Sequence, residues 1–295
     1  MAKPEKLLIT GCRGQLGRDL ISILSQEYDV IGIDLNDADI CDRTAISSVI
    51  ERIRPHVVLH TAAYTDVDGC ESDQERATAV NAVGTRNVAL ACKEVSAWMI
   101  YYSTDYVFDG FNDKPYTEVD KTNPQTVYGK SKLAGEEAVL TKLEDAVIMR
   151  IAWVYGQYGK NFVRTMLKLG REQLRATQRG EIAEPLNIVD DQFGNPTWTV
   201  DVVRQTEAIL ESDIRGVVHA TSDGEVSWFG LAKAVFEITD QSVLMRPCTT
   251  ANYPLPAPRP RRSSLENARL KQLGLNLMRP YRAALQEFLK QGEAP

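Results

Sequence analysis

Short runs of apolar residues alternate with longer stretches of helical periodicity through the first half of the chain. Strands and helices are predicted in turn at 6–10, 14–26, 29–35, 43–53, 55–63, 77–95 and 98–104. This alternation is typical of a parallel sheet with helices on both faces. The predicted strands are apolar almost throughout, as strands buried on both faces must be. The pattern therefore predicts an α/β fold with a doubly wound parallel sheet.

The rhythm of the pattern changes after Gly156. A helix at 124–143 and a buried strand at 146–156 come before the change, and shorter elements follow it at 162–174, 186–198, 200–211, 216–221, 228–239 and 279–289. Four prolines between 254 and 260 forbid a helix, so we expect an extended surface loop there. We predict two parts: a nucleotide-binding domain of 1–155 with parts of 186–220, and a smaller C-terminal α/β substrate lobe of 156–185 and 221–295.

The composition excludes several classes of partner. The chain has 295 residues and a net charge of −6, so no positive field attracts a nucleic acid or an anionic membrane surface. No run approaches the roughly 20 apolar residues that a membrane helix needs. The five scattered cysteines, without a CxxC pair, predict reduced thiols rather than disulfides or a zinc site. The N-terminus lacks the apolar run of a signal peptide, so we expect a cytoplasmic protein.

A glycine-rich turn follows the first predicted strand. It reads TGCRGQLG, with Gly11, Gly14 and Gly17 spaced GxxGxxG directly before a helix. Glycines at such a turn let the backbone approach a pyrophosphate, and the helix N-terminus supplies free N–H groups and a positive dipole. The turn therefore predicts a Rossmann-like dinucleotide site.

Two side chains near this turn favour different dinucleotides. Asp34 ends the second predicted strand, where a carboxylate would bond the adenosine ribose of NAD and repel the extra phosphate of NADP. Arg13 lies inside the turn, where a guanidinium could pair with that phosphate. The sequence therefore predicts NADPH or NADH as cofactor and leaves the preference open.

Tyr128 and Lys132 stand about one turn apart in the predicted helix 124–143, so their side chains share a face. A solvated helix face would explain such a pair without any chemistry. The context changes that interpretation, because Ser103, Thr104 and Asp105 end a strand upstream of this YxxxK pair. With the glycine-rich turn, these elements resemble the catalytic site of the extended short-chain dehydrogenase/reductase superfamily.

Six longer motifs narrow the resemblance. In chain order they are STDYVFDG, VYGKSKLAGE, RIAWVYG, NFVRTML, VDDQFGNPT and RPRRSSLENARLKQLG. Together they resemble the dTDP-4-dehydrorhamnose reductase family over essentially the whole chain. The resemblance implies NAD(P)H-dependent reduction of the 4-keto group of dTDP-4-dehydro-L-rhamnose to dTDP-L-rhamnose, a step in the biosynthesis of cell-surface polysaccharide.

The resemblance also implies roles for single residues. Tyr128 would donate a proton to the carbonyl oxygen of the sugar, Lys132 would lower the pKa of Tyr128, and Thr104 would donate to the substrate oxygen. Further contacts with the substrate are expected from Asp105, Trp153, Asn161 and Arg261. Contacts with the cofactor are expected from Gly11, Arg13, Gly14, Gln15, Leu16, Gly17, Asp34, Asp39, Ile40, Ala62, Ala63, Tyr64, Tyr128 and Lys132.

One of these expectations, and a separate interpretation of His60, rest on the residues themselves. Arg259, Arg261 and Arg262 belong to the proline-rich run, and because an arginine fork suits the phosphate oxygens of a sugar nucleotide, we expect at least one of them, with Arg261 favoured, to contact the diphosphate. His60, at the end of a predicted strand, is interpreted as a buried histidine with satisfied hydrogen bonds rather than a catalyst.

The sequence departs from the family in two places. Some enterobacterial relatives hold magnesium at a dimer interface through a glutamate after the NPT motif, but here Trp198, Thr199 and Val200 follow, and Asp19 would be a single ligand. We predict no metal, and either a monomer or a homodimer. The stretch 175–187 is longer than usual in the family, and it is either a lid or a passive insertion.

Alternative functions remain open. The same fold serves as a non-catalytic, nucleotide-binding regulatory subunit, although such a protein has no chemical need for Thr104, Tyr128 and Lys132. Another nucleotide-sugar reductase or epimerase is a nearer alternative. Dehydratases of this fold carry Asp-Glu after the strand-end threonine, whereas Asp105 and Tyr106 follow it here.

Overall fold

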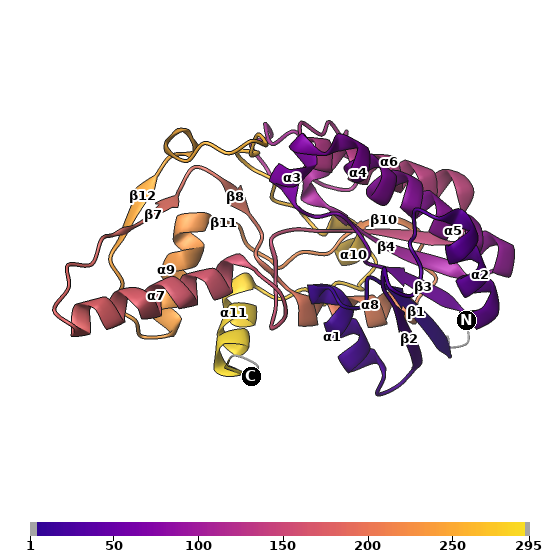
Figure 1. Cartoon of the computed structure of the whole chain (residues 1–295), viewed down its shortest axis with the longest axis horizontal. Helices are drawn as coiled ribbons and strands as arrows, with labels where there is room; N and C mark the ends of the chain where they lie inside the picture. Colours follow the sequence, from indigo (N-terminus) through magenta and orange to yellow (C-terminus); the bar gives the residue numbers. More distant parts are fainter. Residues whose placement is uncertain (1–4, 293–295) are drawn as a thin grey trace.

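The computed structural model describes residues 5–292, and its larger part is built around one six-stranded sheet (Figure 1). Every neighbouring pair of strands in this sheet is parallel. In spatial order the strands are β10 (Gly216–His219), β5 (Ala146–Ile151), β4 (Trp98–Thr104), β3 (Val57–His60), β1 (Lys6–Thr10) and β2 (Asp29–Ile33). The predicted fold class is confirmed.

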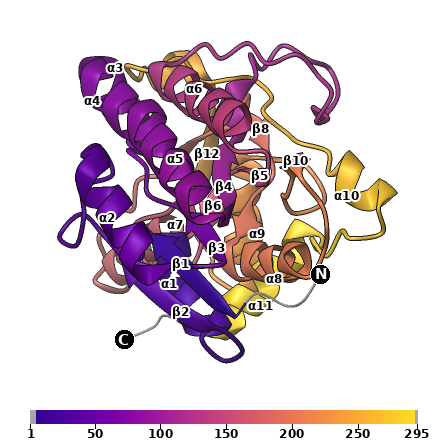
Figure 2. The ribbon, with the colours of Figure 1, turned by 90° about the vertical axis from the view of Figure 1, so that its right-hand side faces the viewer.

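Helices cover both faces of the sheet because successive strand residues face opposite sides. Leu8, Val58 and Met99 pack against α2, α5 and α6, and Figure 2 shows α5 and α6 side by side. Leu7 and Ile9 pack on the other face against α1, α8 and α10. These helices are α1 (Gln15–Leu24), α2 (Arg43–Ile53), α5 (Thr85–Val95), α6 (Val127–Lys142), α8 (Thr199–Leu210) and α10 (Ala268–Gln272).

The helix predicted at 77–95 is interrupted by a π-helical turn, η1 (Ala79–Gly84). Two short helices come before it, α3 (Val67–Ser72) and α4 (Gln74–Thr78). Asn81 lies in the widened turn and is fully buried. Such turns place a side chain where a regular helix would not, and they are frequent at functional sites.

The single strand predicted at 146–156 is wrong. β5 ends at Ile151, and the chain turns at Trp153, whose φ of 44° lies in the left-handed region. A second strand, β6 (Val154–Tyr155), then pairs with β9 (Thr197–Trp198) outside the large sheet. A continuous apolar run hid this turn, because apolarity reports burial and not the direction of the backbone.

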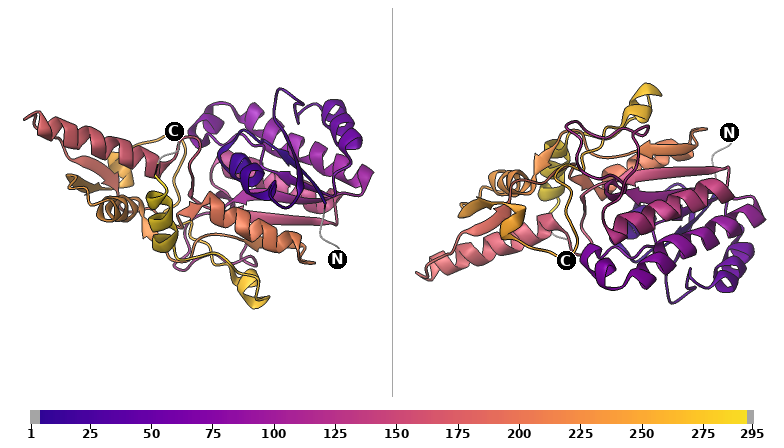
Figure 3. Two further views of the ribbon diagram at one scale, coloured as in Figure 1. Left: turned by 90° about the horizontal axis from the view of Figure 1, so that it is seen from below. Right: turned by 90° about the horizontal axis from the view of Figure 1, so that it is seen from above.

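The second lobe is a layer of helices against small strand pairs. α7 (Phe162–Gln178), α9 (Trp228–Ile238) and α11 (Tyr281–Lys290) surround a core that includes Trp198, Phe236 and Phe288. The strand pairs are β7 (Leu186–Val189) with β12 (Met245–Cys248), and β8 (Phe193–Gly194) with β11 (Val226–Ser227). Figure 3 shows α7 reaching away from the sheet to the far end of this lobe.

The polar stretch after α7 is shorter than predicted, because the helix continues to Gln178. Ile182 in this stretch is 92% exposed. Within the predicted stretch 175–187, Asn187 lines the third cavity described below and Ile182 lines none of the cavities, so both alternatives for this stretch stay predictions.

The proline-rich run forms no regular helix or strand, as expected, and it connects the two parts of the molecule. Short 3₁₀ turns, η2 (Asp105–Val107) and η3 (Thr250–Asn252), lie elsewhere in the chain. The Ala257 N–H donates to Asp68 Oδ1 at 3.0 Å, and Arg259 pairs with Asp68 Oδ2 at 2.7 Å. Asp68 belongs to α3, so the run is fixed across the face where the two parts meet. In the described part of the chain, no helix has both the length and the apolarity needed to cross a membrane.

Candidate active site

Two adjoining cavities lie at the carboxyl ends of the parallel strands, where open α/β sheets bind ligands. The first cavity, about 290 Å³, is lined by Gly11, Asp34 and Tyr64 among others. The second cavity, about 490 Å³, is lined by Thr104, Tyr128 and others. Gly14, Thr61 and Ala63 line both cavities. The two cavities together therefore form one elongated site.

The glycine-rich turn forms the floor between β1 and α1, and it has no room for side chains. Gly11 has a φ of +69°, and a Cβ there would lie 2.7 Å from the backbone of Ala62. A Cβ on Gly17 would lie 2.4 Å from the carbonyl oxygen of Gly11. Gly14 precedes α1 and has no side chain to cap the first N–H groups of the helix. This cradle fits a dinucleotide pyrophosphate.

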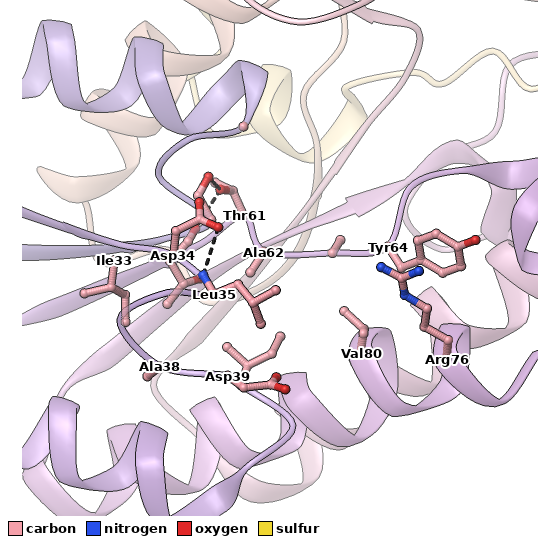
Figure 4. A pocket seen from close by; sticks show the side chains of 15 residues that line it. Ile33, Asp34, Leu35, Ala38, Asp39, Thr61, Ala62, Tyr64, Arg76 and Val80 are labelled. Carbon is pink, nitrogen blue, oxygen red and sulfur yellow. Dashed lines mark hydrogen bonds between the residues drawn. The ribbon is translucent and has the colours of Figure 1, made fainter. Parts of the chain in front are cut away.

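The end of β2 closes the first cavity, as Figure 4 shows for Asp34 and Asp39. Asp34 Oδ2 accepts from the Arg13 N–H at 2.9 Å, and Oδ1 accepts from the Leu35 N–H at 2.9 Å. Carboxylate oxygens keep further lone pairs for a ribose hydroxyl. The Arg13 side chain is exposed and lines neither cavity.

The segment after β3 is held rigidly against the cradle. His60 is fully buried, with Nδ1 2.7 Å from Thr10 Oγ1 and Nε2 3.1 Å from Thr85 Oγ1. Burial, and then the charge of Lys132, lower the pKa of His60 to about 3, so the ring stays neutral. The interpretation of His60 as a structural histidine is confirmed.

Tyr64, Ala62 and Ala63 line the first cavity, as predicted. The buried Asn81 fixes their loop: its Oδ1 accepts from the Tyr64 N–H at 2.8 Å, and its Nδ2 donates to Tyr64 O at 3.0 Å. The same Nδ2 donates to Ser131 Oγ of α6 at 2.9 Å. The π-helical turn therefore joins the cofactor loop to the helix that carries Tyr128.

Tyr128, Lys132 and Thr104 all line the second cavity. Tyr128 is 9% exposed and Lys132 only 2%, so the spacing predicted from the helix turns both side chains inward. Thr104 ends β4, and its Oγ1 accepts from the Tyr106 N–H at 3.2 Å and donates to Asp105 Oδ1 at 2.9 Å. The structure thus gathers the predicted catalytic residues in one place.

Burial has the largest effect on the protonation of the pair. Burial raises the pKa of Tyr128, and the neighbouring Thr104 hydroxyl offsets part of this rise. Burial lowers the pKa of Lys132 to about 7, against the opposing charge of Glu136. Lys132 Nζ donates to Tyr102 O at 2.7 Å and lies 4.1 Å from the Tyr101 ring centroid. Tyr128 is therefore protonated at neutral pH in the cofactor-free protein.

Asp105 and Trp153 also line the second cavity. Burial raises the pKa of Asp105 to about 6. The Trp153 ring stacks on Trp228 with centroids 3.4 Å apart, and a Cβ added to Gly194 would lie 2.3 Å from Trp153 Cε2. The left-handed backbone, Gly194 and Trp228 together set the position of the Trp153 ring.

A third cavity of about 390 Å³ lies in the second lobe and shares Trp228 with the second. Its lining includes Gln192 and Arg259. Arg261, by contrast, is exposed and lines a separate cavity of about 120 Å³ beside Phe193.

Asn161 lies between the two parts of the molecule. Its Oδ1 accepts from the Arg164 N–H at the start of α7, and its Nδ2 donates to Gln15 Oε1 at 2.8 Å. Neither Asn161 nor Arg261 lines the second or third cavity. The structure therefore brings together all the predicted substrate residues except these two.

Asp19, which was considered for a metal, and Asp201, the first carboxylate after the NPT motif, are both buried. Asp19 is buried within α1, and Asp201 pairs with Arg279 at 2.8 Å and Arg204 at 3.1 Å. Within residues 5–292, no group of three or more His, Cys, Asp or Glu side chains could hold a metal ion. The five cysteines are all free thiols.

Two residues of the site were not predicted. Asn81 supports the loop of Tyr64 and follows no motif used above, although its place before the GT of NAVGT is a local signal. Trp228 reaches the site from the second lobe, as does Arg259, one of the three candidate arginines of the proline-rich run. Spacing along the chain gives no indication of such contacts, because they depend on how the two parts pack.

Comparison with known proteins places this geometry in a family. The family model described as RmlD substrate binding domain matches residues 5–294. The dTDP-4-dehydrorhamnose reductase of Mycobacterium tuberculosis is 42% identical over 291 residues, covering 96% of this chain and 92% of the relative. The dTDP-4-keto-6-deoxy-D-glucose reductase of Streptomyces niveus is 38% identical, covering 95% of each.

A solved structure agrees with these relatives. The dTDP-4-dehydrorhamnose reductase from Bacillus anthracis, in complex with NADP, has a TM-score of 0.92 and 35% identity, covering 97% of this chain and 99% of that one. The cavities described above thus belong to a fold shared along almost the whole chain. The chain belongs to the dTDP-4-dehydrorhamnose reductase family, whose members carry the RmlD substrate binding domain.

Proposed function

We propose that this chain is an NAD(P)H-dependent reductase that converts the 4-keto group of dTDP-4-dehydro-L-rhamnose to the alcohol of dTDP-L-rhamnose. The observation that carries the proposal is the meeting of Thr104, Tyr128 and Lys132 in a cavity continuous with a dinucleotide cradle. Family membership supports the same reaction.

The nucleotide cofactor, when bound, supplies the hydride for the carbonyl carbon. Tyr128 donates its phenolic proton to the carbonyl oxygen, and its raised pKa keeps that proton in place until the reaction. Thr104 donates a second hydrogen bond to the same oxygen once its proton turns from Asp105. Lys132 holds the nicotinamide ribose, and its charge stabilises the phenolate that remains on Tyr128.

The two parts of the molecule serve the cofactor and the substrate respectively. The nucleotide-binding domain, 1–155 with parts of 186–220, carries the cofactor, and the lobe of 156–185 and 221–295 covers the substrate. The sugar ring occupies the second cavity against Asp105 and Trp153, and the nucleotide extends past Trp228 into the third. Arg259 lines that cavity and is a second candidate, beside Arg261, for the diphosphate.

A different sugar is the main alternative. The Streptomyces niveus relative is named for dTDP-4-keto-6-deoxy-D-glucose, and it covers 95% of this chain. The purified protein should therefore be assayed for NADPH and NADH oxidation with both 4-keto sugars. Faster turnover of dTDP-4-dehydro-L-rhamnose supports the proposal, whereas selective use of the other sugar replaces its substrate. No oxidation with either sugar would favour the non-catalytic regulatory subunit.

A further inference from the structure

A buried ion pair lies directly behind the catalytic helix face. Arg150 of β5 donates to Glu136 of α6 through Nε to Oε1 at 2.9 Å and through Nη2 to Oε2 at 2.7 Å. The two side chains are only 5% and 2% exposed. The Ser103 hydroxyl donates to the same Oε1 at 2.5 Å. Glu136 is therefore held by three hydrogen bonds in the interior.

The pair connects three elements that carry site residues. Glu136 stands four residues after Lys132, on the face of α6 that already carries Tyr128. Ser103 immediately precedes Thr104 at the end of β4. Arg150 lies near the end of β5, just before the turn that places Trp153. One carboxylate thus fixes the catalytic helix against both strands that reach the second cavity.

The groups around Lys132 leave Glu136 as its counter-charge. On β3, His60 is neutral at physiological pH, and on β4, Tyr101 presents its ring and an un-ionised hydroxyl. On α6 itself, Tyr128 is also protonated. Among charged side chains of residues 5–292, Glu136 favours the ammonium form of Lys132 against burial, beside the Tyr102 carbonyl and the Tyr101 ring that Nζ contacts.

On the side away from Glu136, Arg150 forms no ion pair with a second carboxylate of residues 5–292. Its Nη1 lies 3.4 Å from His219 Nε2, and its guanidinium lies 5.1 Å from the Phe108 ring centroid. Burial, and then the charge of Arg150, keep the pKa of His219 near 3, so this ring is neutral. Glu136 therefore pairs directly with Arg150, and its charge also acts on Lys132 one turn earlier in α6.

We propose that Glu136 is a positioning residue for the reductase reaction: it orients α6 against the strands that carry Thr104 and Trp153, and it keeps the Lys132 side chain charged. This inference rests on the proposed function for its catalytic meaning. A buried pair kept only for structure would be a weak stabiliser, because the desolvation of both charges opposes their attraction. The distinguishing property is the ionisation of Lys132, which a purely structural pair would leave unchanged.

The test measures that ionisation directly in the cofactor-free protein. NMR of the protein with ¹³C-labelled lysine follows the lysine side chains, and the signal that is missing in Lys132→Met is the signal of Lys132. In Glu136→Gln, which keeps shape and loses charge, the titration midpoint of Lys132 should fall by about one pH unit. Glu137→Gln is the matched control, because Glu137 is the neighbouring carboxylate on α6 but is exposed. The Lys132 midpoint in Glu137→Gln should equal that of the wild type.

A second variant covers the case in which Glu136→Gln does not fold, since it leaves Arg150 buried and unpaired. Glu136→Gln with Arg150→Gln removes both charges, and the Lys132 midpoint should again fall. Turnover of a folded variant should be compared with that of the wild type at the same pH. The loss should be about tenfold greater at pH values above the shifted Lys132 midpoint than at pH values below it.

A Lys132 midpoint equal to the wild-type value in either folded variant would overturn the proposal. Failure of the proposed function is a separate result. It would appear as a wild-type protein that reduces neither 4-keto sugar, while the Lys132 midpoint still falls on loss of Glu136.

Discussion

Burial controls the protonation of the residues that would carry the reaction. Tyr128 sits in a cavity where the pKa of its hydroxyl is raised, so the group that must give up a proton holds it at neutral pH. The Thr104 hydroxyl donates its single proton to a hydrogen bond with Asp105. The same environment raises the pKa of Asp105 to about 6. Small changes at these side chains should therefore be visible in pH-dependent measurements.

Asp105 gives a prediction for stability. The ordinary pKa of an aspartate is 3.8, and in the folded chain the pKa of Asp105 is about 6. Between these two pH values the folded chain holds a proton on Asp105 that the unfolded chain has released. The free energy of unfolding thus loses a contribution as pH rises through this window, by roughly 2–3 kcal/mol. Asp105→Asn lacks this loss, so denaturant titrations should show the variant gaining stability relative to the wild type between about pH 4 and pH 7. A pH-independent difference would contradict the assignment.

Asp34 and Arg13 give a prediction for cofactor choice. Asp34 lines the first cavity and Arg13 does not, so repulsion of the NADP phosphate should dominate. We expect the wild type to use NADH at least as well as NADPH, and Asp34→Ala to shift kcat/KM toward NADPH. Arg13→Ala is the comparison, and a selective loss of NADPH use there would give the dominant role to Arg13. A wild type that ignores NADH would refute this weighting.

At the level of elements, local patterns predicted most of the fold. The strands of the large sheet and the cradle were identified because burial on both faces and glycine spacing are local signals. Helical periodicity predicted that Tyr128 and Lys132 share a face, and the neighbouring motifs, not periodicity, favoured a functional face over a solvated one. The turn at Trp153 and the π-helical turn at Asn81 were missed, because both are backbone conformations imposed by contacts with distant segments.

The turn at Trp153 provides a prediction for its supporting strand. Gly194 of β8 lies against the Trp153 ring, so the Cβ of Gly194→Ala would displace it or the strand. We expect a rise of about tenfold in KM for the sugar nucleotide with cofactor affinity unchanged, and a loss of about 1–3 kcal/mol in stability. Gly180→Ala is the control for KM, because its Cβ would meet nothing within 4 Å, whereas its φ of +77° strains an alanine and makes its stability no comparison. An unchanged KM in Gly194→Ala would exclude Trp153 from the sugar site.

At the level of the whole molecule, the proposed substrate site depends on two parts that lie far apart in the sequence. The sheet domain contributes the cradle and the helix that carries Tyr128, and the lobe contributes Trp228 and Arg259 to the lining of the cavities. The proline-rich run joins them through Asp68. Sequence patterns indicated a second lobe but could not show which of its arginines faces the cavities, since that depends on packing between the parts.

The arginines can be separated by kinetics. Arg259→Ala should raise KM for the dTDP sugar by about tenfold with a smaller change in kcat, the pattern of lost uniform binding. Arg261→Ala tests the residue predicted from the sequence, which lines only the small cavity. Asp68→Asn breaks the same ion pair while keeping Arg259, so it should leave KM nearly unchanged. If Asp68→Asn reproduces the effect of Arg259→Ala, the arginine acts through the connection and not on the diphosphate.

The central claim is that Tyr128 donates the proton in reduction of a dTDP-linked 4-keto sugar. The most direct measurement is the formation of dTDP-L-rhamnose from dTDP-4-dehydro-L-rhamnose and NADPH by the wild type and by Tyr128→Phe. Removal of one hydroxyl should lower turnover by roughly 10²–10⁴-fold and leave cofactor affinity near normal. Turnover in Tyr128→Phe equal to that of the wild type would contradict the mechanism.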